Sequence, residues 1–124
     1  MSPLAWLAFV GAAAVGAPLR YLMDGAIGER VEGAFPWGTL AVNASGSLVL
    51  GVLTGLALYH AFPATPKVIL GTGFCGAYTT FSTFTYETVR LIEEGAVDEA
   101  FRNVAGTFFV CASAAALGLA VAAL

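Results

Sequence analysis

The chain has 124 residues, of which 59% are hydrophobic and 10% are charged, and its mean hydropathy is +0.85. Soluble domains carry about 25% charged residues, so this composition excludes an ordinary soluble domain and indicates a membrane protein. The net charge of −3 gives no reason to expect a polyanionic partner. Cys75 and Cys111 stand in apolar stretches without metal-binding or redox spacing, which predicts two small buried thiols.

Charged residues are absent from four long windows, which cover residues 1–19, 33–66, 68–86 and 103–124. Each window can supply about 20 largely apolar residues, enough to cross a hydrocarbon core ~30 Å thick. The sequence therefore predicts an all-α membrane protein with a single domain (1–124) and four transmembrane helices, at about Pro3–Leu22, Trp37–Ala61, Val68–Leu91 and Phe101–Ala123. No basic residue precedes the first apolar run, as one would in a signal peptide, so we expect an uncleaved first helix.

Basic residues are few, and four crossings would distribute them unevenly. Arg20, Arg30, Arg90 and Arg102 would share the side of the first and third connections, whereas Lys67 alone would mark the other side. The positive-inside rule then places the arginines in the cytoplasm. Because there are only five basic residues, insertion in both orientations stays open. The first helix also contains a proline, Pro18, which we expect near its end.

The second predicted helix carries a polar face and a row of small residues. Thr39, Asn43 and Ser47 recur every four residues and share one face. A buried asparagine either hydrogen-bonds to a neighbouring helix or lines a pore, and the sequence leaves both possibilities open for Asn43. Ser47, Gly51 and Gly55 continue the same spacing, which predicts close packing against another helix.

The third window contains G-T-G-F-C-G-A-Y-T-T-F-S-T-F at Gly71–Phe84. Its glycines and hydroxyls predict a helix that breaks around Gly76–Thr79 and then restarts. Inside a bilayer, irregular backbone is tolerated only where protein or a wet cavity surrounds it. Freed carbonyl groups at such a break can bind a cation, and freed N–H groups can bind an anion.

After the predicted break, Phe81 and Phe84 share a face of the helix, and Ser82 and Thr83 supply hydroxyls. Aromatic rings have a positive edge, so ring edges beside polar donors would suit a small, hard anion. Two phenylalanines in a membrane helix can equally be simple packing residues, and spacing alone does not decide between these readings.

The remaining polar residues favour a passive channel over a pump or an enzyme. Asn103, Thr107 and Cys111 form a weaker row in the fourth window, where we expect core packing. Asp24 and Glu87 are expected at helix ends, which would leave no carboxylate in the middle of a span. A proton-coupled transporter usually places an ionisable group at depth. The sequence also shows no nucleophile–base pair, so we expect no enzyme.

Three strings together identify a known family. G-A-P-L-R-Y at Gly16–Tyr21, W-G-T-L-A-V-N at Trp37–Asn43 and G-F-C-G-A-Y-T-T-F-S-T-F at Gly73–Phe84 occur in the order found in the Fluc (CrcB-type) fluoride channels. The chain resembles this family over nearly its whole length. The resemblance implies an antiparallel, dual-topology homodimer in the inner membrane that exports fluoride passively from the cytoplasm and so lowers its toxicity.

The resemblance also implies roles for individual residues. The fluoride pathway would comprise Phe81 and Phe84 as the phenylalanine box, Asn43 as the pore asparagine, Ser82 and Thr83 as the polar track, and Thr39 and the more loosely matched Thr107. Arg20 would stand in a vestibule, and Glu87 near the pore end. The backbone carbonyl groups of Gly76 and Thr79 would hold a structural sodium ion at the dimer interface.

Two alternatives compete with the channel. A small multidrug-type dimeric transporter also has four spans, but it needs a mid-span carboxylate in the first helix, and Met1–Leu19 contains none. A non-transporting membrane assembly subunit would explain the glycines, but not the polar face of Asn43 beside a hydroxyl-rich break.

Overall fold

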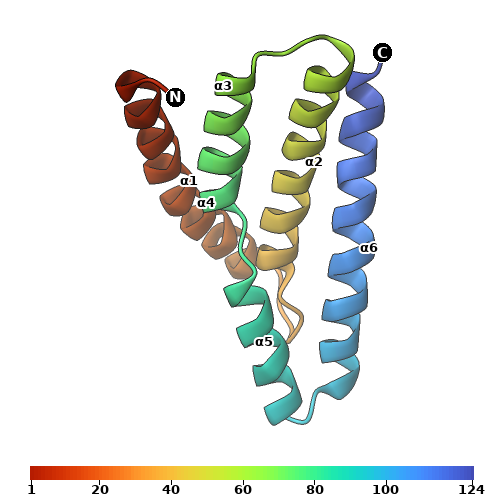
Figure 1. The fold of residues 1–124 in the computed structure, drawn as a ribbon. Helices are drawn as coiled ribbons and strands as arrows, with labels where there is room; N and C mark the ends of the chain where they lie inside the picture. Colours follow the sequence, from red (N-terminus) through yellow and green to blue (C-terminus); the bar gives the residue numbers. More distant parts are fainter.

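The computed structural model describes all residues, Met1–Leu124, and is entirely helical (Figure 1). The chain makes four helical passes, built from α1 (Pro3–Arg30), α2 (Trp37–Tyr59), a divided third pass of α3 (Ala64–Lys67), η1 (Val68–Cys75), α4 (Gly76–Tyr78) and α5 (Ser82–Glu93), and finally α6 (Val97–Ala122). Three helices, α1, α2 and α6, are long and apolar enough to cross a membrane. Both termini lie at the same end of the molecule (Figure 1). The prediction of an all-helical membrane fold is confirmed.

The first helix is longer than predicted. It starts where the Ser2 hydroxyl accepts a hydrogen bond from the amide of Ala5, and it continues past Leu22 to Arg30. Pro18 therefore lies inside the helix, not near its end. The prediction stopped at the last apolar residues, but helix formation depends on backbone propensity, and residues 23–30 contain no proline to stop it.

The two carboxylates expected at helix ends are also placed differently. Asp24 stands within α1, and Glu87 stands in the middle of α5. The fourth helix likewise begins at Val97, before the predicted Phe101. Acidic side chains in its first turn favour this early start, because carboxylates interact well with the positive end of a helix dipole.

The α2 and α6 helices form the closest packed pair in the chain. On α2, Gly51 faces the backbone of Ala115, and on α6, Gly118 faces the carbonyl group of Leu48, so a Cβ at either glycine would overlap backbone atoms. Gly55 lies against Ala122 in the same seam. The predicted small-residue row is thus a packing surface, as glycine rows between membrane helices usually are.

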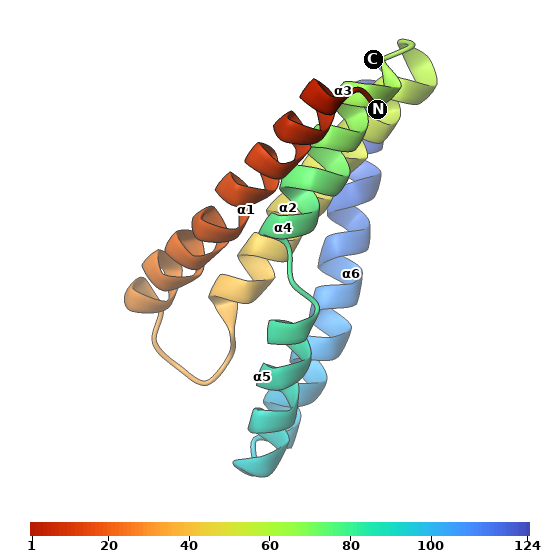
Figure 2. The same ribbon diagram turned by 60° about the vertical axis from the view of Figure 1, so that its left-hand side comes forward.

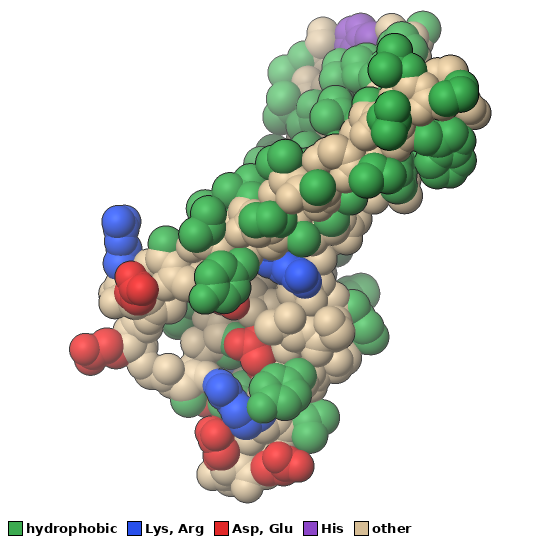
Figure 3. Space-filling model, turned by 90° about the vertical axis from the view of Figure 1, so that its left-hand side faces the viewer, with side chains coloured by type: hydrophobic (Ala, Val, Ile, Leu, Met, Phe, Trp, Pro, Cys, Tyr) green, Lys and Arg blue, Asp and Glu red, His purple; other side chains and the backbone are tan.

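The first helix packs on the opposite side of the bundle, against the upper half of the third pass (Figure 2). Gly16 is buried there, and a Cβ on it would overlap the Phe74 carbonyl oxygen. The third pass itself starts as a π-helix, η1, with Gly71, Gly73 and Cys75 buried. Charged side chains gather at the end that carries the 31–36 and 94–96 connections, away from the apolar upper half (Figure 3).

Candidate functional site

The third pass leaves helical geometry at Thr79, whose backbone is extended (φ −76°, ψ 162°), and resumes it at Ser82. The connecting segment is visible between α4 and α5 in Figure 1. Asn43 of α2 pairs with this segment: its Nδ2 donates to the Thr80 carbonyl (2.9 Å), and its Oδ1 accepts from the Thr80 amide (2.8 Å). The pairing fixes the orientation of the asparagine amide and supplies partners to backbone groups outside the helical ladder.

Thr80 also organises the restart of the helix. Its hydroxyl accepts from the Thr83 amide (3.1 Å) and donates to the Thr83 hydroxyl (3.0 Å), so it caps the first turn of α5. The sequence analysis did not single out Thr80. The available signal was a threonine just before the expected restart of the helix, because Thr side chains favour helix N-termini.

A groove of about 870 Å³, here called the larger groove, lies between α2, the third pass and α6. Phe81 and Phe84 line it with ring centroids 5.8 Å apart and planes inclined by 40°. Phe81 is 76% exposed in the single chain. The polar side chains that line the groove are Asn43, Ser47, Thr72, Thr79, Thr80 and Thr107. The groove therefore combines two aromatic rings with hydrogen-bonding groups.

Asn43 can serve both the backbone and the larger groove. Its amide nitrogen carries two hydrogens, and the bond to the Thr80 carbonyl uses one of them. Because Asn43 also lines the groove, the other hydrogen remains for a partner there. The structure thus joins the two possibilities that the sequence left open, an inter-helix contact and a polar lining.

A second, smaller pocket of about 180 Å³ holds the residues predicted for the vestibule and the polar track. Arg20, Thr39 and Thr83 line it, together with Asp24 and Thr80. Thr80 also lines the larger groove, so the interrupted segment separates the two spaces. Thr39 is buried, and its hydroxyl donates to the Glu87 carboxylate (2.5 Å), which joins α2 to α5.

The other predicted residues are placed less centrally. Ser82 lines neither space and lies 3.4 Å from the Thr80 hydroxyl. Asn103 is 1% exposed and donates to the Thr88 hydroxyl (2.9 Å), while it accepts from Thr107 (3.3 Å). The expected core role of Asn103 agrees with this burial, whereas Thr107 and Cys111 face the larger groove.

Gly76 and Thr79, predicted as sodium ligands, also line the larger groove. No group of three or more His, Cys, Asp or Glu side chains stands together in the chain. A cation here would therefore have to use backbone carbonyl and hydroxyl oxygens, which suit hard cations. The Thr79 amide and hydroxyl both donate to the Cys75 carbonyl (2.9 and 2.8 Å), so they hold the end of α4 in place.

These features define a small multi-pass helical membrane protein with a polar and aromatic groove beside an interrupted helix. The chain belongs to the CrcB family: the family model described as "CrcB-like protein, Camphor Resistance (CrcB)" matches residues 6–119. The resemblance drawn from the sequence motifs is confirmed.

Several relatives are similar over almost their whole length. The chain is 50% identical over 122 residues to the fluoride-specific ion channel FluC 1 of Frankia casuarinae, covering 94% of this chain and 95% of that protein. It is 48% identical to FluC 1 of Streptomyces avermitilis, covering 94% and 90%. It is 46% identical to FluC 1 of Leifsonia xyli subsp. xyli, covering 96% and 87%.

Proposed function

We propose that this chain forms a fluoride-selective channel that lets fluoride leave the cytoplasm passively and thereby lowers its toxicity. The observation that carries the proposal is the larger groove, in which Asn43, Phe81 and Phe84 meet beside the interrupted third pass. Relatives that share about half of the sequence are named fluoride-specific ion channels. The chain is not an enzyme.

The groove offers what a small, strongly hydrated anion needs when it leaves water. Each lost water contact must be replaced by a donor, because an unpartnered ion in a low-dielectric interior is very costly. The free N–H of Asn43 is such a donor. The hydroxyls of Thr80 and Thr107 donate to Thr83 and Asn103, so each would have to turn away from that partner to donate to the ion. The positive edges of Phe81 and Phe84 add a weaker attraction between them. A larger halide would fit a narrow, donor-lined path poorly.

A second copy of the chain would complete this path. The larger groove is open along one side, and Phe81 is 76% exposed in the single chain. Large apolar exposure beside a polar lining is typical of an interface. We propose that two chains pair in antiparallel orientation, each inserted in the opposite sense, and that each groove is closed by the partner subunit. The small number of basic residues supports dual insertion.

The interrupted third pass has two roles in this proposal. The carbonyl groups of Gly76 and Thr79 hold a structural sodium ion at the dimer interface. The segment 79–81 carries Phe81, one of the two residues of the phenylalanine box, and separates the larger groove from the smaller pocket. Arg20 in that pocket forms a vestibule that attracts fluoride, and Glu87 holds Thr39 at the pore end through their hydrogen bond.

The protein would act in the inner membrane, with the four arginines, which lie toward the side of the first and third connections, in the cytoplasm for one of the two orientations. A small multidrug-type transporter is not favoured. The charge-free stretch Met1–Leu19 has no carboxylate at depth, and a proton-coupled transporter usually requires one.

Anion efflux from liposomes tests the function directly. We expect vesicles loaded with potassium fluoride to release fluoride when valinomycin balances the charge, without any imposed pH gradient, and vesicles loaded with chloride to stay full. Equal release of chloride, or fluoride release only in a proton gradient, would contradict a passive fluoride channel. Crosslinking between chains of known orientation tests the antiparallel dimer separately.

A further inference from the structure

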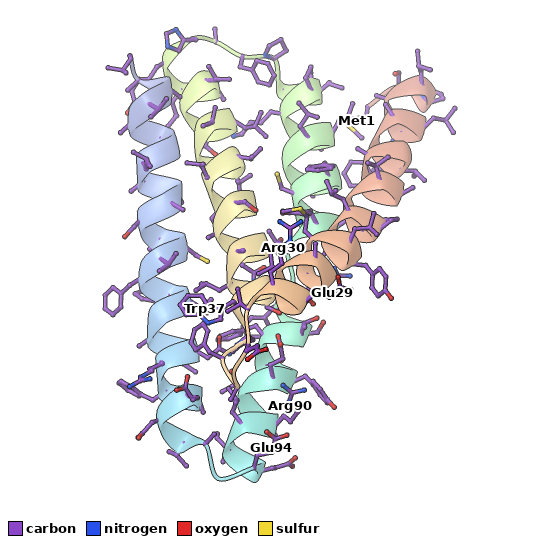
Figure 4. The ribbon with its side chains drawn as sticks, turned by 180° about the vertical axis from the view of Figure 1, so that it is seen from behind. Met1, Glu29, Arg30, Trp37, Arg90 and Glu94 are labelled. Atoms are coloured by element: carbon purple, nitrogen blue, oxygen red, sulfur yellow. The ribbon has the colours of Figure 1, made fainter.

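A second groove, here called the side groove, lies at the end of the molecule that carries the charged connections. It has a volume of about 700 Å³ and is formed by the 31–36 connection, the start of α2 and the first half of α6. Its walls are mainly apolar and aromatic, with Trp37, Leu40, Phe101 and Phe109 among them. Figure 4 shows Trp37 between α2 and α6. Aromatic residues at this level of a membrane protein are typical of the boundary between lipid chains and headgroups.

The side groove faces away from the larger groove. The larger groove uses Thr107, Phe108 and Cys111 of α6, whereas the side groove uses Ala105 and Phe109, and no residue lines both. At ~100° per residue, these two sets point roughly 130° apart around the helix axis. A partner subunit seated on the larger groove would therefore leave the side groove facing the surrounding bilayer.

The mouth of the side groove carries a distinctive set of charges. Arg102 is the one basic residue, and Glu32 and Glu99 are the two acidic ones. The Arg102 guanidinium lies 3.0 Å from the Glu99 carboxylate, and the Arg102 side chain is still 68% exposed. A guanidinium has five N–H donors, so one ion pair leaves most of them available. The mouth thus offers donors for an anion next to acceptors for a cation.

We infer that the side groove binds a phospholipid with an ethanolamine headgroup. Its phosphate would accept hydrogen bonds from the Arg102 guanidinium, and its primary ammonium would donate to Glu32 or Glu99. The two carboxylates face a single guanidinium, so one negative charge at the mouth has no positive partner without the ammonium. An anionic glycerol headgroup would add a further negative charge beside these carboxylates. A choline headgroup has no N–H to donate.

The length of the side groove agrees with a lipid chain. Eight residues separate Arg102 from Val110 at its far end, which corresponds to ~12 Å along the helix. That distance approaches half of a ~30 Å hydrocarbon core. One acyl chain would therefore lie along α6 while the headgroup stays at the charged mouth. This inference rests on membrane insertion and does not depend on which ion the larger groove conducts.

Gly106 offers a direct way to fill the side groove. It lies in the lining, and a Cβ on it would meet no atom within 4 Å, so Gly106→Leu should fold normally. Gly11 of α1 is a matched control, because a Cβ there also meets nothing within 4 Å and Gly11 lies outside the side groove. Arg102→Gln removes the phosphate partner without filling the space.

Native mass spectrometry would count lipids on protein taken from vesicles with equal amounts of phosphatidylethanolamine, phosphatidylglycerol and phosphatidylcholine. We expect the wild-type chain and Gly11→Leu to retain phosphatidylethanolamine over the other two by up to about fivefold, the upper end of what one exposed ion pair supplies. Gly106→Leu should lose the bound lipid, and Arg102→Gln should lose the headgroup preference.

Three outcomes would overturn the inference. Equal retention of the three lipids, or a preference for phosphatidylglycerol, contradicts the headgroup assignment. Lipid retention by Gly106→Leu places the lipid elsewhere. Conversion of Gly106→Leu to a monomer would show that a second copy of the chain covers this groove. Fluoride flux, measured in parallel on the same variants, reports on the channel separately.

Discussion

Replacing Asn43 by alanine should destabilise the protein because it removes both partners of the Thr80 backbone. The Asn43 amide donates to the Thr80 carbonyl and accepts from the Thr80 amide, and Asn43 is only 8% exposed. In Asn43→Ala, both Thr80 groups lose these bonds at a point where the chain has left the helix. No neighbouring helical turn can replace the lost partners.

The magnitude follows from the number of groups left unpaired. A buried donor or acceptor without a partner costs ~1–3 kcal/mol, so two of them give ~2–6 kcal/mol. Thr80 lines both the larger groove and the smaller pocket, and water entering either space would relieve part of this cost. We therefore expect a loss of ~2–3 kcal/mol in the free energy of unfolding.

Asn103→Ala is the matched control, since Asn103 is also a buried asparagine but bonds only to hydroxyls. Its partner Thr88 keeps a hydrogen bond to the Phe84 carbonyl (2.8 Å) when Asn103 is removed. We expect this control to lose ~1 kcal/mol, the value of an ordinary hydrogen bond. Unfolding in mixed micelles measures both variants. Equal stability losses for the two variants would refute the proposed role of Asn43 at the interrupted segment.

Asn43→Asp separates the structural role from the channel. A carboxylate still accepts from the Thr80 amide, but it offers no N–H to the Thr80 carbonyl or to the larger groove. Fluoride flux through liposomes should therefore stop even where the folded protein is recovered. Wild-type flux in Asn43→Asp would show that Asn43 does not donate to the ion.

Three further predictions use other parts of the molecule. Phe81→Ile and Phe84→Ile should each reduce fluoride efflux by at least about tenfold, which corresponds to ~1.4 kcal/mol. Their elution in size-exclusion chromatography should stay unchanged. Normal fluoride flux in both variants would show that the ring edges do not take part in conduction. Gly118→Ala should destabilise the α2–α6 pair by ~1–3 kcal/mol, because the new Cβ would overlap a backbone carbonyl. In the control Gly106→Ala the new Cβ meets open space, so we expect no loss of stability from overlap. Thermal unfolding measures both variants. Replacing sodium with N-methylglucamine should lower the thermal stability of the purified protein if carbonyl groups such as that of Thr79 hold a sodium ion, and an unchanged melting temperature in both salts would count against that site.

The sequence predicted the parts of the fold that depend on composition and spacing. Four charge-free windows predicted the four helical passes, of which three contain a helix long and apolar enough to cross a membrane. The i, i+4 spacing of Gly51 and Gly55 predicted the packed face of α2. The grouping of Asn43, Phe81 and Phe84 in one site followed from the resemblance to the fluoride channels, whereas composition and spacing marked Asn43 as a polar residue within an apolar helix. Polarity inside an apolar helix is conspicuous because it is costly there, so such residues can be recognised without knowing their partners.

Helix ends were predicted less well. The first helix runs past its apolar stretch to Arg30, and α6 begins before the expected Phe101. The limits of a charge-free window describe where the bilayer ends, whereas a helix continues as long as its backbone hydrogen bonds are favourable. For the same reason, Asp24 and Glu87 lie inside helices and not at their ends.

The role of Thr80 depended on pairing that spacing cannot reveal. Asn43 and Thr80 are 37 positions apart in the chain, and their contact exists only because α2 packs beside the interrupted segment. The sequence could show a polar residue on α2 and a break in the third pass. It could not show that the first supplies the hydrogen bonds that the second lacks.

The π-helix η1 explains why the break lies where it does. In η1, the amide of Gly76 bonds back to the Gly71 carbonyl, five residues earlier, in place of the usual four. This wider turn buries Gly71, Gly73 and Cys75 on one side, where a Cβ on Gly73 would come within 3.2 Å of Phe9 in α1. Close approach of α1 therefore accompanies the wide turn, and the missing side chain at Gly73 favours this approach. If these residues formed a regular α-helix, the residues after them would be placed differently around the helix axis. Each one-residue change in register would rotate them by ~100°. Thr79–Phe81 would then no longer face Asn43, so the geometry of the site depends on a helical irregularity that begins at Val68, eleven residues before Thr79.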